Sequence, residues 1–91
     1  MKTSRGGIVT LLCEVEAERM AGLAAGRACR VEGLGMHFLS PGRIGPIVAR
    51  ATLLTDTPGE GSSHLRVRVH DAGAGDRLIA AASATARPSG P

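Results

Sequence analysis

The chain has 91 residues and a formal net charge of +3, enough for one small domain that buries only somewhat over ~60% of its unfolded surface. A partner chain would add to its stability. Hydrophobic residues make up 43% of the sequence, but Phe38 is the single aromatic residue, so the core must be aliphatic and rich in alanine. The basic residues are spread along the chain, and stacking aromatics are missing, which argues against nucleic acid as a partner.

The two cysteines, Cys13 and Cys29, are too far apart for a Cys-x-x-Cys site and have no His or Cys companions at metal-ligand spacing. They are expected to be buried free thiols, with no metal bound. No stretch is long enough to span a bilayer, and the sequence contains no signal-peptide pattern, so the expectation is a cytoplasmic protein without membrane contact.

Residues 8–25 predict a long helix, because they contain strong helix formers between Gly6–Gly7 and the stop at Gly26. The apolar residues of this segment cover well over half of the helical circumference, which is typical of an enclosed helix. A sheet is therefore expected to wrap around it.

Four strands are expected after the helix. Residues 29–39 form an extended segment, residues 47–55 a strand, and residues 64–71 the most regular strand, because apolar and polar residues alternate strictly there. Residues 77–87 are rich in alanine, which favours helix, but small residues alternate in a way that favours a strand lying close to the helix.

Glycine and proline place loops between these elements. The loops and turns fall at 40–46, 56–63 and 72–76, and residues 88–91 are expected to be a disordered tail. Residues 1–87 then form a single α+β domain in which an antiparallel sheet packs on one long central helix.

The order of these segments resembles the hotdog-fold acyl-CoA thioesterases, most closely the phenylacetate-pathway and 4-hydroxybenzoyl-CoA type. The resemblance is carried by "RGGIVTLLCE", "HFLSPGRIGPIVARATLL" and "VRVHDAGAGDRLIAAASATAR", and it covers Arg5 to Arg87. The last two segments look like the second repeat of tandem members. Family domains carry an opening strand before the glycine pair, so this chain looks N-terminally shortened, which leaves a sheet edge for another chain to cover.

The resemblance implies a thioesterase site. The family acid lies seven residues after the second glycine, a position that Glu14 occupies as catalytic base or nucleophile, while Gly6 supplies the oxyanion-hole amide. Two positions depart from the pattern: Arg5 replaces the usual His, and Ala21 stands where some members have Ser or Thr.

The resemblance also implies a coenzyme A thioester as substrate, no separate cofactor, and a homo-oligomer, either a dimer or a tetramer. Arg5 and Gly7 would lie beside the substrate. Guanidinium groups bind phosphate oxygens bidentately, so Arg43, Arg66 and Arg68 are candidates for holding the phosphates of coenzyme A.

Other interpretations stay open from the sequence. Gly6–Gly7 could be only a flexible entry to the helix and Glu14 a surface acid, and the three histidines have no Ser or Cys partner at catalytic spacing. A non-catalytic hotdog module that binds acyl-CoA or serves as an oligomerisation half is the alternative function. A third interpretation is a mis-set start inside a longer tandem reading frame.

Overall fold

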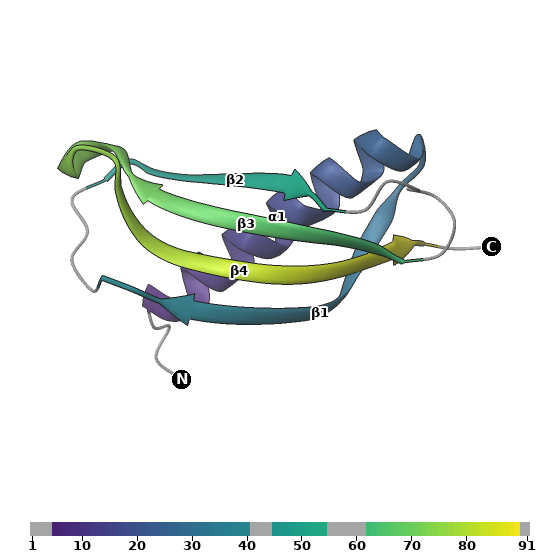
Figure 1. Cartoon of the computed structure of the whole chain (residues 1–91), viewed down its shortest axis with the longest axis horizontal. Coiled ribbons are helices and arrows are strands. Elements are labelled where there is room, and N and C mark those ends of the chain that lie inside the picture. The colour runs from purple at the N-terminus through teal and green to yellow at the C-terminus, as the bar shows by residue number, and fades with distance from the viewer. Residues whose placement is uncertain (1–4, 41–44, 55–61, 90–91) are drawn as a thin grey trace.

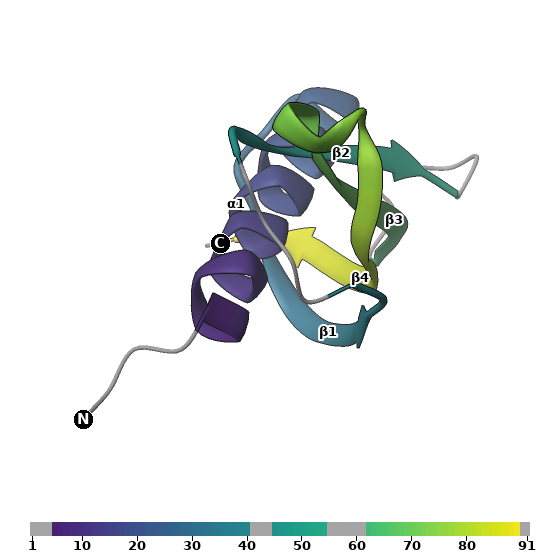
Figure 2. The ribbon, with the colours of Figure 1, turned by 90° about the vertical axis from the view of Figure 1, so that its left-hand side faces the viewer.

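A computed structural model describes residues 5–40, 45–54 and 62–89 of the chain as one helix on a four-stranded antiparallel sheet. The helix α1 spans Arg5–Ala25, and the sheet has the order β1-β4-β3-β2. α1 runs obliquely across one face of the curved sheet, whose two edges are β1 and β2 (Figures 1 and 2). The strand bounds are β1 Cys29–Phe38, β2 Ile47–Leu53, β3 Ser63–Asp71 and β4 Arg77–Pro88, and a 3₁₀ turn η1, Ala72–Ala74, joins β3 to β4.

The helix begins three residues before the expected 8–25 segment. Gly6 and Gly7 lie in its first turn instead of ahead of it, although glycine is about 1 kcal/mol less favourable than alanine inside a helix. Position in the first turn reduces this cost to the helix, because the residues there have few intrahelical hydrogen bonds to lose. The C-terminal end is as expected: Gly26 adopts a left-handed conformation, φ 72°, and its N–H donates to the carbonyl of Gly22.

The helix buries one narrow stripe against the sheet. The residues of this stripe recur every four positions and are at most 3% exposed: Val9, Cys13, Ala17 and Ala21. The expectation of an enclosed helix therefore holds for one side only. Apolar side chains on the other side are more than half exposed, namely Ile8, Leu11, Val15 and Leu23.

The alanine-rich segment forms a strand, as predicted from its alternation. β4 lies between β1 and β3 in the centre of the sheet and pairs with both in antiparallel register. Its residues Ala80, Ala82, Ala84 and Ala86 are 0–4% exposed. Because alanine has almost no side-chain volume, the helix backbone can approach the sheet closely over this strand, which explains why propensity for helix was overridden.

Several boundaries differ from expectation or lie outside the described residues. β4 continues past Arg87: Pro88 pairs with Cys29, and the Ser89 N–H donates to the carbonyl of Ala28. The two final residues of the expected tail, most of the 56–63 turn and residues 41–44 of the 40–46 loop are outside the described part. Both cysteines are free, but only Cys13 is fully buried.

One buried carboxylate connects two loops at the end of the sheet where β2 begins. Asp71 is 0% exposed, and its Oδ1 accepts hydrogen bonds from the N–H of Gly45 at 2.8 Å and of Gly73 at 3.1 Å. The carboxylate thus caps η1 and holds the start of β2 beside it.

In the described residues no helix is both long and apolar enough to cross a bilayer.

Candidate functional site

The first turn of α1 offers the backbone donors that an oxyanion site requires. Gly6 is the second residue of the helix, where N–H groups have no acceptor one turn earlier in the same helix. The aligned peptide dipoles add a partial positive charge at this end. A developing negative charge on a carbonyl oxygen would be stabilised here, as the resemblance implies for Gly6.

Glu14 lies on the flank of the helix that faces β1. Thr10, Glu14 and Glu18 are one turn apart on this flank and are all partly buried. The position of the flank follows from Glu18, whose Oε2 accepts a hydrogen bond of 3.0 Å from the Val31 N–H at the start of β1. Glu14, one turn nearer the N-terminus, is therefore held beside this edge strand.

The Glu14 carboxylate has no hydrogen-bond or ion-pair partner within the described residues. Glu16, on the flank that faces β2, differs in this respect: its Oε2 lies 2.6 Å from the Arg19 guanidinium. That hydrogen bond, with a smaller Coulombic contribution from the same arginine, lowers the pKa of Glu16 despite its partial burial. Of these two acids on α1, Glu14 is the one whose carboxylate is not engaged elsewhere.

The two predicted catalytic groups are well separated along one chain. Glu14 follows Gly6 by eight residues, which corresponds to about 12 Å along a helix axis at ~1.5 Å per residue. Side chains tilt toward the helix N-terminus, which shortens the gap by less than the length of a glutamate side chain. A carbonyl oxygen bound by Gly6 is therefore more than a hydrogen bond away from Glu14 of the same chain.

The predicted substrate-binding residues are distributed over separate places. Gly7 lies in the first turn of α1 with Gly6. Arg66 and Arg68 alternate with the buried residues of β3, so they extend from the sheet face opposite α1. The structure does not bring these two arginines to the helix N-terminus. Arg43 and the Arg5 side chain lie outside the described part, so their roles stay predictions.

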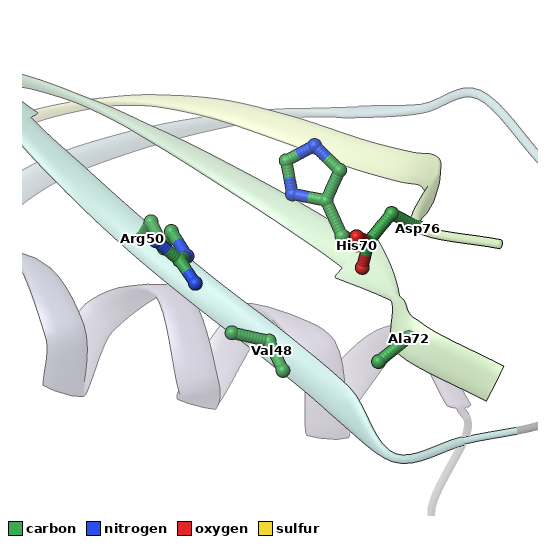
Figure 3. Close-up of a pocket in the computed structure, with 5 residues that line it drawn as sticks. All are labelled: Val48, Arg50, His70, Ala72 and Asp76. Atoms are coloured by element: carbon green, nitrogen blue, oxygen red, sulfur yellow. The ribbon is translucent and has the colours of Figure 1, made fainter.

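The sequence predicts the basic pair Arg66 and Arg68 on the outer face of the sheet but not Arg50, which the structure adds to it. Arg50 of β2 is the direct cross-strand neighbour of Arg68. Beside this pair lies an open pocket of about 480 Å³ (Figure 3), which is lined by Val48, Arg50, His70, Ala72 and Asp76. The sequence of 47–53 contains a pattern that could have predicted this position. Arg50 stands between the small apolar residues Ala49 and Ala51, and alternation along a strand places it on the outer face.

No group of three or more His, Cys, Asp or Glu side chains in the described ranges is arranged to hold a metal ion. The histidines lie on the outer face of the sheet, with His37 and His64 exposed and His70 partly buried. Thr85 Oγ1 lies 3.5 Å from His64 Nδ1, a contact between side chains of neighbouring strands. These histidines therefore offer no metal centre to the helix end where Gly6 lies.

Comparison with known proteins identifies the fold. No family model and no curated protein matches the sequence. An X-ray structure of a protein from the thioesterase superfamily matches with a TM-score of 0.81 at 17% identity, covering 96% of this chain and 63% of that one. A Bacillus halodurans protein crystallised with CoA matches with a TM-score of 0.79 at 18% identity, covering 91% of this chain and 54% of that one.

The chain therefore has the hotdog fold of thioesterase-superfamily structures, as the resemblance predicted. It spans less than two thirds of the length of both structures that it matches. Similarity at this level of identity defines the arrangement of helix and sheet, while the chemistry has to be argued from the residues of this chain.

Proposed function

We propose that the protein is an acyl-CoA thioesterase, with Glu14 as general base or nucleophile and the Gly6 amide as oxyanion donor. The observation that carries the proposal is the Glu14 carboxylate, which is partly buried beside β1 and has no partner among the described residues. The CoA bound to one fold neighbour supports a coenzyme A thioester as substrate.

The chemistry follows from these two groups. Glu14 takes a proton from a water molecule as the water oxygen attacks the thioester carbonyl carbon, and the resulting oxyanion is stabilised by the Gly6 N–H. The tetrahedral intermediate collapses, the C–S bond breaks, and the proton returns from Glu14 to the coenzyme A thiolate. Direct attack by the Glu14 carboxylate, followed by hydrolysis of the anhydride, uses the same groups.

A homodimer forms part of the proposal because of the spacing within one helix. About 12 Å of helix rise separates Gly6 from Glu14, so two copies could place Gly6 of one chain and Glu14 of the other at the same carbonyl. The exposed apolar side chains on the outer side of α1, namely Ile8, Leu11 and Val15, would supply contact area for a second copy.

The first experiment compares Glu14→Gln with Glu16→Gln. Hydrolysis of a panel of acyl-CoA thioesters is followed by titration of the released thiol, at matched oligomeric state. Losing a general base removes ~10²–10⁴-fold of rate, so Glu14→Gln should lose most of its turnover. Glu16→Gln changes the same atoms on the same helix and should stay close to wild type. Equal turnover in wild type and Glu14→Gln would contradict the assigned role.

The second experiment isolates the Gly6 amide. Gly6→Pro removes the N–H in the first turn, where proline fits helical geometry, while Gly6→Ala keeps the N–H and adds a methyl group. Loss of one oxyanion donor costs ~10²–10³-fold in kcat. We expect this loss in Gly6→Pro alone. A comparable loss in both variants would indicate that space near Gly6 is required, and not its hydrogen bond.

The alternative function is a non-catalytic hotdog module that binds acyl-CoA or acts as an oligomerisation half. The exposed apolar side of α1 favours it, because such a surface serves association whether or not chemistry follows. A folded, oligomeric wild-type protein that binds acyl-CoA but releases no thiol from any member of the panel would establish this alternative.

A further inference from the structure

Three arginines form a cluster on the outer face of the sheet, which we call the outer arginine cluster: Arg50, Arg66 and Arg68. Arg50 and Arg68 are direct neighbours across β2 and β3, and Arg66 follows on the same face two residues along β3. Directly opposite residues have Cβ atoms about 4.5–5.5 Å apart, and residues two apart on a strand are separated by about 6.5–7 Å. All three side chains are exposed.

Within the described residues, none of these three guanidinium groups forms an ion pair with a carboxylate, although Asp76 lines the same pocket as Arg50. Two other arginines do have such partners: Arg19 lies 2.6 Å from Glu16, and Arg87 lies 3.2 Å from Glu32. On β4, the residues opposite Arg68 and Arg66 are the uncharged Ala81 and Ser83. Like charges directly opposite each other destabilise a sheet, so the Arg50–Arg68 pair is a local conflict that an external anion would relieve.

The pocket next to this cluster has room for a small molecule. Its volume of about 480 Å³ lies within the range of ~300–1,000 Å³ typical of small-molecule sites. Arg50 belongs to both the cluster and the pocket, and Figure 3 shows its side chain on β2 together with the other lining side chains, among them His70 and Asp76. A compact ligand could therefore place phosphates on the arginines and its remaining groups in the pocket.

The chemistry of the lining points to a nucleotide. Three guanidinium groups match two or more phosphates, because each can bind phosphate oxygens bidentately. The Asp76 carboxylate accepts hydrogen bonds, as ribose hydroxyl or exocyclic amino groups could donate them, and Val48 and Ala72 provide apolar contact for a base. An isolated phosphate would use only the arginines and leave the pocket empty.

We propose that the outer arginine cluster and the adjoining pocket bind a nucleotide that carries at least two phosphate groups. This site lies on the sheet face opposite α1, apart from Gly6 and Glu14 of the same chain. As a site for coenzyme A it rests on the proposed function, whereas as a site for a free nucleotide it does not. The nucleotide could be the 3′-phospho-ADP portion of coenzyme A or a free nucleoside diphosphate, which present the same phosphate chemistry.

The test is calorimetric titration of the whole chain with 3′,5′-ADP, coenzyme A, ADP, adenosine and inorganic phosphate. We expect binding of the phosphorylated nucleotides that weakens with added salt, and much weaker binding of adenosine and phosphate. Preference for 3′,5′-ADP and coenzyme A would identify the coenzyme end as the source, whereas equal binding of ADP would identify a free nucleotide. Absence of binding by every phosphorylated nucleotide at millimolar concentration would overturn the proposal.

Variants decide whether binding is local. Arg50→Gln and Arg68→Gln should each weaken nucleotide binding on the order of tenfold, as expected for a charge-assisted hydrogen bond. The matched control is Arg30→Gln, which removes the same charge from the exposed edge strand β1. A loss in Arg30→Gln equal to that in the other two would mean diffuse attraction and would overturn the site, as would unchanged binding in Arg50→Gln and Arg68→Gln. Circular dichroism confirms that each variant is folded.

Discussion

The two faces of the sheet are built from the same strands but follow different physical rules. On the inner face, Leu65, Val67 and Val69 are at most 1% exposed and pack toward α1 with the alanines of β4. On the outer face, the alternate residues of β3 are charged or polar and face solvent. On the inner face, the volumes of the side chains decide which residues fit. The outer face tolerates an arrangement of charges that weakens the sheet.

This difference means that stability and ligand binding can be changed separately. Substitutions on the inner face alter close packing, which cannot relax without loss of contacts. Substitutions of the outer arginines alter exposed charges, which affect unfolding only slightly but act directly on anions. Three variants on the sheet test this division, and a fourth tests an ion pair on the exposed side of α1; they follow in order of decreasing expected effect.

The largest effect is expected for Leu65→Ala on β3. Leu65 is 1% exposed in the core, so its truncation removes buried methyl groups and leaves a cavity under α1. Changes of this kind cost ~2–5 kcal/mol, a large part of the stability of a small domain. Urea unfolding followed by circular dichroism measures the loss. A loss below ~1 kcal/mol would show that the inner face is loosely packed.

A smaller loss is expected for Ala82→Leu on β4. Ala82 is 3% exposed in the sheet centre, between Met36 of β1 and Val67 of β3. Added methylene groups in a packed core cost ~1–3 kcal/mol. Ser83→Leu, on the exposed outer side of the same strand, is the control and should change the unfolding free energy by much less. Equal effects at both positions would contradict the assignment of the two faces.

The third variant should raise stability. Arg68→Thr removes the like-charge neighbour of Arg50 and introduces a residue favoured in strands, for a gain of ~0.2–1 kcal/mol. Arg66→Thr is the control, because Arg66 faces Thr52 and Ser83 instead of an arginine. A greater gain for Arg68→Thr than for Arg66→Thr in urea unfolding at low salt isolates the charge conflict. Equal stability of Arg68→Thr and Arg66→Thr would show that repulsion between Arg50 and Arg68 does not destabilise the sheet.

The smallest effect concerns the exposed ion pair on α1. Because the Arg19 hydrogen bond lowers the pKa of folded Glu16, the pair adds stability above the ordinary glutamate pKa. This contribution is lost as pH falls through the lowered pKa, because protonated Glu16 has no negative charge to attract the Arg19 guanidinium. Arg19→Gln should therefore be slightly less stable than wild type at pH 7 and equal to it near pH 2. If Arg19→Gln remained less stable than wild type near pH 2, the ion pair with ionised Glu16 could not be the cause.

Much of the fold could be predicted from alternation in the sequence. The alternation in 64–71 predicts both faces of β3 correctly. The alternation of small residues in 77–87 predicts a strand despite their helix propensity, and β4 confirms it, with Ala80, Ala82, Ala84 and Ala86 buried. The helix was recognised from its length and composition. Its exposed side was not, because an apolar helix surface has the same sequence whether a sheet or solvent lies against it.

The sites were harder to predict because they depend on pairing between distant strands. Arg50 is one exposed residue in its own strand, and only the register of β2 against β3 places it opposite Arg68. The sequence predicts the glycine pair ahead of the helix, since glycine has a low helix propensity, whereas in the structure the pair lies in the first turn, where that cost is small. Glu14 was selected by resemblance, and no periodic feature of the helix distinguishes it from Glu16.

The hydrogen bond from Val31 to Glu18 also limits how this protein can aggregate. An edge strand normally offers its free N–H and C=O groups to any other extended chain, which is how uncontrolled sheet growth and fibres begin. At the start of β1, the Val31 N–H already donates to the helix carboxylate. A strand from another chain that pairs with β1 cannot accept a hydrogen bond from the Val31 N–H. Pairing with this edge is therefore favoured only over the part of β1 between Val31 and Phe38.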